Sequence, residues 1–151
     1  MLDRSLRVAA AVVGVGTTRQ GQIPGRTADM IAVDALTLAL QDAGIKKSTV
    51  DGLITCKSYG DQGIDTAIGA LIGLNPRYSA TLEYGTCNFS LHLAAMAIQS
   101  GMATTIALLY STDQRSGGNR FQSAAGRGND LTESYGFFNI AGPAAMAFRR
   151  H

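Results

Sequence analysis

Residues 78–101, YSATLEYGTCNFSLHLAAMAIQSG, decide the fold of this chain. Tyr78–Glu83 is a short run typical of a strand, and the Ala-rich stretch His92–Ser100 is typical of an apolar helix that stops at Gly101. The seven residues between them, YGTCNFS at 84–90, join the two elements. The sequence therefore predicts a turn from a strand into a helix at this point.

The residues before this stretch predict two further strands and a helix. Val8–Val15 is a continuous run rich in Val and Ala, as expected for a strand that is buried on both faces of a parallel sheet. Thr27 is a good N-cap for the helix that follows, and Gly44 is placed to end it. Gly52–Cys56 reads as the next strand. A strand, a helix and a strand in this order favour a right-handed parallel crossover.

The remaining elements continue the same alternation. A helix is expected from about 64 to 74, closed by Asn75 and Pro76, and a further strand over Thr104–Ser111. A long glycine-rich segment then leads to a last helix, Gly142–Arg150, with Pro143 in its first turn. The chain is thus predicted to be an α/β protein, with a mainly parallel sheet and helices on both faces (layered α/β/α).

The composition narrows the class of protein. Hydrophobic residues make up 46% and charged residues 16% of the 151, which excludes a disordered chain and suggests a surface that another domain or subunit covers. A net charge of +2 without clustered Lys and Arg argues against nucleic acid as a partner. No apolar run approaches the roughly 20 residues that span a bilayer, so we expect a soluble, cytoplasmic protein with its two cysteines, Cys56 and Cys87, reduced.

Several strings of sequence, in this order and spacing, resemble the thiolase superfamily, and within it the sterol-carrier-type thiolases and their thiolase-like lipid-transfer relatives. The strings are AVVGVGTT (11–18), PGRT (24–27), ALQDAG (39–44), VDGLI (50–54), HLAAMAI (92–98) before Gly101, and GPAA (142–145).

The resemblance covers the first of the two similar halves of a thiolase subunit and part of the inserted loop region. It implies a thiolase-like N-terminal domain over 1–112 and part of the loop domain over 113–151. The later motifs of the family, with the catalytic histidine and the second cysteine, have no counterpart here. The resemblance therefore implies that this chain carries an incomplete active site, as a fragment or as a half-protein whose partner supplies the rest.

In family members that perform thiolysis, the nucleophile is a cysteine at a helix N-terminus, where aligned N–H groups lower the thiol pKa. Cys87 is the candidate in this chain. Counting back from Ile98 and Gly101 without a gap, however, puts Tyr84 at the nucleophile's place and Cys87 at that of a small glycine. Tyr84 is then either a general acid or base in an aldol-type C–C cleavage or a buried, hydrogen-bonded ring. Cys87 is then a small buried hydrophobe.

Two functions follow from the resemblance. The first is acyltransferase chemistry of thiolase type, forming or cleaving a C–C bond next to a coenzyme A thioester. The second is a non-catalytic subunit that binds lipid or acyl-CoA or serves as a structural partner, or an aldolase-type relative that lacks the nucleophilic cysteine. A CoA thioester is the expected substrate, with no permanently bound cofactor. We also expect a homodimer, paired through the edge of Tyr78–Glu83, or a complex with a partner chain.

Other polar residues have plainer interpretations. His92, inside an apolar helix, is expected to be a satisfied core or interface histidine. Cys56 has no companion ligands at metal spacing, so no metal site is expected. Arg115, Arg120 and Arg127 either face a CoA phosphate or belong to a solvated loop.

Overall fold

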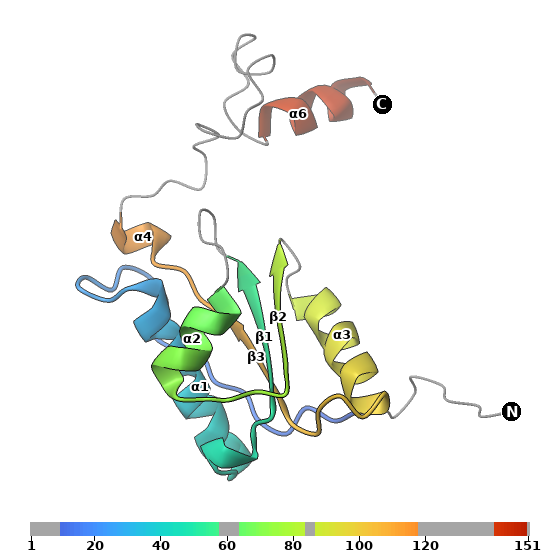
Figure 1. Ribbon diagram of the computed structural model, residues 1–151. Helices are drawn as coiled ribbons and strands as arrows, with labels where there is room; N and C mark the ends of the chain where they lie inside the picture. The colour runs from blue at the N-terminus through green and yellow to red at the C-terminus, as the bar shows by residue number, and fades with distance from the viewer. Residues whose placement is uncertain (1–9, 58–63, 84–86, 118–140, 151) are drawn as a thin grey trace, which may run out of the picture.

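The computed structural model describes residues 10–57, 64–83, 87–117 and 141–150. Their centre is a parallel sheet of three strands in the order β2-β1-β3, shown in Figure 1: β1 (Gly52–Lys57), β2 (Tyr78–Glu83) and β3 (Ile106–Tyr110). Parallel strands need crossover connections, and helices supply them. Helix α2 (Ile64–Ile72) lies between β1 and β2 in sequence, and α3 (Cys87–Gln99) between β2 and β3. The predicted α/β class is confirmed.

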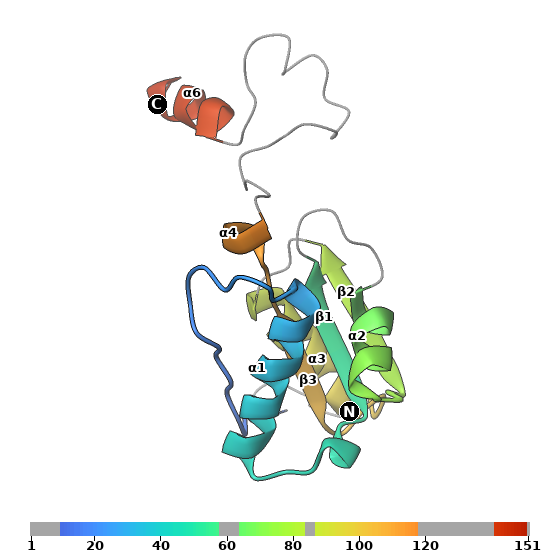
Figure 2. The same ribbon diagram turned by 90° about the vertical axis from the view of Figure 1, so that its left-hand side faces the viewer.

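The helices cover both faces of the sheet. Helices α1 (Ala28–Ala43) and α2 lie on one face and α3 lies on the other (Figure 2). The main core forms between α1, α2 and the sheet, where apolar side chains are removed from water. Its buried members are Ala32, Leu36, Leu53, Ile68 and Leu109.

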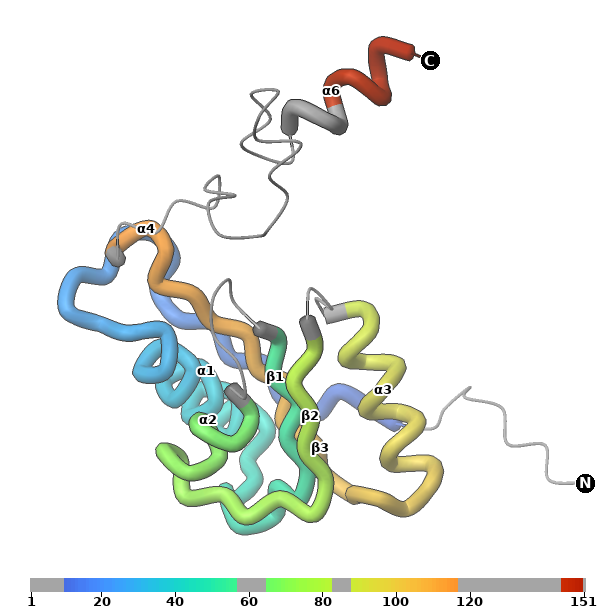
Figure 3. Tube along the Cα trace, turned by 45° about the horizontal axis from the view of Figure 1, so that its top comes forward, coloured from blue at the N-terminus to red at the C-terminus, as the bar shows by residue number. Residues whose placement is uncertain are grey.

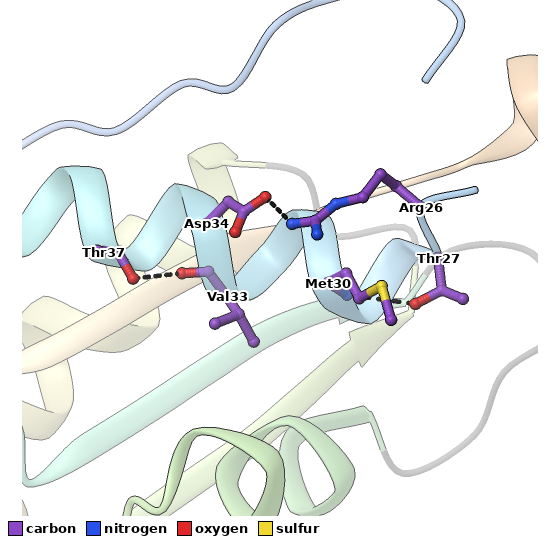
Figure 4. Close-up of polar contacts among 6 residues, drawn as sticks. All are labelled: Arg26, Thr27, Met30, Val33, Asp34 and Thr37. Carbon is purple, nitrogen blue, oxygen red and sulfur yellow. Dashed lines mark hydrogen bonds and ion pairs between the residues drawn. The ribbon is translucent and has the colours of Figure 1, made fainter. Parts of the chain in front are cut away.

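Helix α1 begins and ends as the sequence predicts. The Thr27 side chain accepts a hydrogen bond from the Met30 N–H at 3.3 Å, as an N-cap does, and an ion pair joins Arg26 to Asp34 in the second turn (Figure 4). At the other end Gly44 adopts φ 65°, and its N–H bonds the last carbonyls of the helix. Glycine adopts this left-handed conformation without the steric strain that other residues incur, so Gly44 was a specific signal for the end of the helix.

The predicted strand over Val8–Val15 is wrong for the residues described. Residues 10–20 form no strand, and they run beside α1 rather than within the sheet (Figure 2). The Val15 N–H donates to the Asp42 carboxylate at 2.8 Å. Side chains that should have been buried on two faces are 63–70% exposed: Val12, Val13 and Val15.

Two glycines explain why this segment can lie against the helix. A Cβ added at Gly14 would lie 2.4 Å from the Ala39 carbonyl oxygen, and one added at Gly16 would lie 2.1 Å from that of Ala35. Only a residue without a side chain allows the two backbones to approach so closely. Among the described strands none pairs with residues 10–20, so helix contacts take the place of sheet pairing.

Other boundaries differ by a few residues. Helix α2 ends at Ile72 rather than near 74, β3 covers only Ile106–Tyr110, and α3 begins at Cys87, five residues before its predicted start. Ser90 is buried in the added turn, so packing on the sheet extends a helix that local preference alone would not start there. Short elements complete the order: a 3₁₀ turn at Lys47–Thr49, α4 (Gln114–Gly117) and α6 (Ala141–Arg150).

Figure 3 follows the chain from the segment beside α1 through the sheet to α4 and then α6. The terminal helix α6 is close to its predicted range, and its side chains from 145 to 150 are exposed. Within the described ranges, every helix is too short or too polar to cross a bilayer.

Candidate active site at the carboxyl edge of the sheet

The carboxyl ends of the parallel strands form one edge, and two helices start beside it. Strands β1 and β2 end at Lys57 and Glu83, which are partners in the register, and β3 ends at Tyr110, opposite Cys56. Helices α2 and α3 begin next to the same edge, as Figure 1 shows. In open α/β sheets ligands bind outside the carboxyl ends of the strands. This edge is therefore the place to look for chemistry.

A small hydrogen-bond network ties this edge together, and we call it the Thr55–Thr81–Asp65 network. Thr55 in β1 and Thr81 in β2 are register partners, and their hydroxyl oxygens are 3.1 Å apart. The Thr81 hydroxyl donates to Asp65 Oδ1 at 2.5 Å, and its oxygen accepts the Asp65 backbone N–H at 3.1 Å. Thr55 is only 1% exposed. The network therefore links the Asp65 carboxylate, at the start of α2, to a buried hydroxyl of the sheet.

The electrostatics keep this carboxylate ionised. Burial raises the pKa of Asp65, but hydrogen bonds from the Thr81 and Ser79 hydroxyls and from backbone N–H groups together outweigh it, so the pKa is lowered from 3.8. Asp65 also lies in the first turn of α2, where a negative charge interacts favourably with the helix dipole. At neutral pH the edge thus holds a fixed negative charge.

Of the two residues that the sequence singles out for catalysis, one begins a helix. Cys87 is the first residue of α3, as a helix-start nucleophile requires. Tyr84 and the Cys87 side chain lie outside the described residues. The catalytic role of each stays a prediction.

The remaining candidates fall in different places. His92 is exposed, so the core alternative is wrong, whereas an interface histidine stays a prediction. Its ring Nδ1 donates to the Asn88 carbonyl at 2.9 Å within α3. Cys56 is a buried residue of β1. Arg115 is exposed in α4, whereas Arg120 and Arg127 lie outside the described residues. No three His, Cys, Asp or Glu side chains gather as a metal site would in the part of the chain that the structure describes.

Sequence reasoning missed the Thr55–Thr81–Asp65 network. Its signal was a threonine at the fourth position of each of the two six-residue strands, together with an aspartate in the first turn of the helix between them. Those hints do not give the register that brings the hydroxyls together.

Comparison with known proteins gives two curated relatives, while no protein-family profile matches the chain. The chain is 32% identical over 125 residues to a steroid side-chain-cleaving aldolase of Thermomonospora curvata, covering 81% of this chain and 32% of the relative. It is 33% identical over 155 residues to a 17-hydroxy-3-oxo-4-pregnene-20-carboxyl-CoA lyase of Mycobacterium tuberculosis, covering 94% and 39%. The chain thus spans less than two fifths of the length of these curated relatives.

Solved structures give a consistent fold. An Ltp2-ChsH2(DUF35) aldolase superposes with a TM-score of 0.76 at 27% identity, over 93% of this chain and 37% of that one. A 3-oxoacyl-[acyl-carrier-protein] synthase III of Aquifex aeolicus gives 0.54 at 15% identity, over 66% and 34%. A monomeric SCP2-thiolase-like protein of Mycobacterium smegmatis gives 0.52 at 17%, over 65% and 22%. The last two are similar in fold alone.

Proposed function

Starting from a chain with a thiolase-like fold, we propose that it is the N-terminal part of an aldolase-type lyase that cleaves a C–C bond next to a coenzyme A thioester. One observation carries the proposal: the chain is 33% identical, over 94% of its length, to a lyase whose substrate is a steroid CoA thioester. The second curated relative is also a C–C-cleaving aldolase. The aldolase-type function is therefore favoured over acyl transfer.

The substrate name of that lyase defines the chemistry that we propose for this chain. A hydroxyl on C17 is β to the thioester carbonyl that C20 carries. Removal of the hydroxyl proton lets the oxygen electrons form a ketone while the C17–C20 bond breaks. The released electron pair becomes the enolate of the thioester, which takes up a proton to give a shorter acyl-CoA. The reaction is redox-neutral and needs a base for the hydroxyl and an acid for the enolate.

We assign one of these proton transfers to Tyr84, which the ungapped sequence register puts at the nucleophile's place of thiolases. A phenol can donate or accept a proton at a reacting oxygen when its pKa is lowered. In sequence it directly follows β2, whose last residue, Glu83, lies at the carboxyl edge of the sheet. The remaining catalytic groups are assigned to sequence outside this chain.

The proposed organisation follows the sequence interpretation. Residues 1–112 are proposed as a thiolase-like N-terminal domain and 113–151 as part of a loop domain. A partner subunit is proposed because the aldolase of highest structural similarity among those compared above is named for two components.

A homodimer is proposed through β2. Among the described strands β2 is an outer strand of the sheet, and before Glu83 it has neither a charged residue nor a proline to protect its edge. A second copy would extend the sheet across a two-fold axis. Light scattering on the full-length protein should give a dimer at micromolar concentration. A clean monomer would overturn this part of the proposal.

Acyl transfer remains the second candidate, favoured by the position of Cys87 as the first residue of α3. The two functions separate through the variant Cys87→Ala in the full-length protein. An aldolase should keep most of its cleavage of a steroid β-hydroxyacyl-CoA, measured as ketone and shorter acyl-CoA by mass spectrometry. A Cys56→Ala variant, at the buried cysteine of β1, is the control for general effects of losing a thiol.

Complete loss of activity in Cys87→Ala, with Cys56→Ala active, would favour acyl transfer through a covalent intermediate. Binding of the CoA thioester without turnover in the unmodified protein would instead support a non-catalytic acyl-CoA-binding subunit. Either outcome would reject the proposed aldolase.

A further inference from the structure

Thr81 lies where β1, β2 and α2 meet. Its hydroxyl donates to Asp65 Oδ1 at 2.5 Å, while its oxygen accepts the Asp65 N–H and lies 3.1 Å from Thr55 Oγ1. A threonine has one hydroxyl proton, and the carboxylate takes it, so Thr55 is the donor in the last contact. One small side chain therefore makes three hydrogen bonds to the two neighbouring elements.

The hydrogen bond from the Asp65 N–H to the Thr81 oxygen satisfies a backbone donor at the start of α2. This amide belongs to the first turn of α2, where N–H groups have no acceptor within the helix. An acceptor for such a group is usually a side chain adjacent in sequence, whereas Thr81 is 16 residues away in β2. The start of α2 is thus tied directly to β2.

This tie is close to the edge at which the proposed chemistry occurs. Thr81 and Thr55 lie near the carboxyl ends of their strands, and Asp65 is the second residue of α2. Only residues 84–86 join the end of β2 to the start of α3 at Cys87. Because a short connection has a limited reach, the position at which β2 ends restricts where α3 can begin.

Packing alone does not require hydroxyls at these positions. Valine has the shape of threonine and suits a strand at least as well, and replacing both partners of a buried hydrogen bond by apolar groups can be nearly neutral. The chain nevertheless places threonines opposite one another and an ionised aspartate against them. A directional network of this kind fixes relative positions, which apolar packing does less sharply.

We propose that Thr81 is a positioning residue: its hydroxyl, held between Asp65 and Thr55, fixes the end of β2 against the start of α2 and thereby places the first turn of α3. The link to aldolase catalysis rests on the proposed function. The placement of α3 does not depend on the proposed function, and a separate measurement tests it.

The test compares Thr81→Val with Thr81→Ser in the full-length protein. Thr81→Val removes all three hydrogen bonds at nearly constant volume, whereas Thr81→Ser keeps the hydroxyl. The control is Thr37→Val, which removes a threonine hydroxyl bonded at 2.9 Å to the Val33 carbonyl in α1, on an exposed side of the helix (Figure 4).

The first readout is the rate at which iodoacetamide alkylates Cys87 at neutral pH, with buried Cys56 as an internal reference. Helix-start amides lower the pKa of a thiol that is aligned with them, so Thr81→Val should slow alkylation of Cys87, on the order of tenfold. Alkylation in Thr81→Ser and Thr37→Val should stay near that of the unmodified protein. Equal rates in all four proteins would overturn the proposal.

The second readout is kcat and KM for cleavage, each corrected for the folded fraction. A misplaced reacting group lowers kcat more than it changes KM, so Thr81→Val should lose about tenfold or more in kcat with KM nearly constant. Thr81→Ser should restore it. A variant that loses only stability, with unchanged kcat per folded molecule, would show that Thr81 is merely structural.

The outcomes keep the two proposals apart. If the unmodified protein cleaves nothing but Cys87 alkylation responds to Thr81, the proposed function fails and the positioning role stands. If the unmodified protein cleaves the substrate but neither readout responds to the Thr81 variants, the proposed function stands and the positioning role fails. Should Thr81→Val fail to fold, Thr55→Val takes its place, because it removes only the hydrogen bond between Thr55 and Thr81. It should lower the alkylation rate of Cys87 and kcat by a smaller factor.

Discussion

The two ends of the sheet each hold one aspartate with a lowered pKa, but the two carboxylates bind different kinds of group. At the amino end, Asp51 accepts the backbone N–H groups of Thr104 and Thr105 at 2.8–3.0 Å and the Thr104 hydroxyl at 2.9 Å. Its own carbonyl accepts the Arg77 N–H at 2.8 Å. Asp51 thus joins the starts of all three strands through backbone groups.

At the carboxyl end, Asp65 instead holds the side-chain hydroxyl of Thr81, and through it that of Thr55. The strands pair through backbone groups and do not need the threonine hydroxyls. The backbone amides bound by Asp51, in contrast, would lose their charged acceptor if Asp51 were replaced. Mutations of the two carboxylates should therefore affect different properties of the protein. Changes at the amino end should chiefly reduce stability, and changes at the carboxyl end should chiefly reduce activity.

The largest expected effect is at the carboxyl end. Tyr84→Phe in the full-length protein should lower kcat for cleavage by about 10²- to 10⁴-fold, because the ring remains while the proton-transfer group is lost. Its unfolding midpoint should stay unchanged. Steady-state kinetics beside a urea titration checks both, and a fully active Tyr84→Phe would remove Tyr84 from the proposed mechanism.

The next effect is at the amino end. Asp51→Ala removes the acceptor of two backbone N–H groups and a hydroxyl, which should cost about 2–4 kcal/mol in the free energy of unfolding. Asp51→Asn, which keeps one acceptor oxygen, should lose less. Urea denaturation measures both variants. Activity per folded molecule should not change, and a drop in kcat at constant stability would break the contrast between the two ends.

The fold was predictable where a local signal decided it. Thr27 and Gly44 mark the ends of α1 because a cap and a left-handed residue are chemical requirements at those positions. The limits of β2 and the stop at Gly101, with φ 77°, were equally visible in the sequence. The parallel arrangement followed from the alternation of strands and helices.

What failed depended on contacts between distant segments. A Val- and Ala-rich run has the same pattern whether it pairs within a sheet or lies extended along a helix, and only Gly14 and Gly16 hinted at the close approach to α1. The network at the candidate site was not predictable either, because it joins side chains from 16 to 26 residues apart through the strand register. Of the site itself, the sequence located the connection from β2 into α3 that contains Cys87, but it placed the helix start at His92, five residues too late.

A smaller effect concerns pH. Hydrogen bonds lower the folded-state pKa of Asp51 and Asp65 below 3.8 although burial opposes this, so their contribution to stability is fully present above the unfolded pKa. It is lost as the pH falls from about 5 through the folded-state values. Unfolding free energies measured between pH 6 and pH 3 should therefore fall less steeply in Asp51→Asn and in Asp65→Asn than in the unmodified protein. Parallel pH curves for all three would contradict the assigned bonds.

The smallest expected effect is the change in stability on replacing Thr55, at the carboxyl end of the sheet. Thr55→Val removes one hydrogen-bond donor but leaves the Thr81–Asp65 bond in place, so stability should change by no more than about 1 kcal/mol. Urea denaturation of Thr55→Val and Asp51→Ala, measured under the same conditions, compares their free energies of unfolding. A loss as large as that of Asp51→Ala would mean that both ends of the sheet serve stability alike.

The most direct test of the central claim is a single turnover of the full-length protein with a steroid β-hydroxyacyl-CoA, quenched at intervals and analysed by mass spectrometry. An aldol-type site at the carboxyl edge predicts a ketosteroid and a shorter acyl-CoA in equal amounts, while the mass of the protein stays unchanged throughout. Intact substrate, or a transient acyl adduct on Cys87, would contradict it.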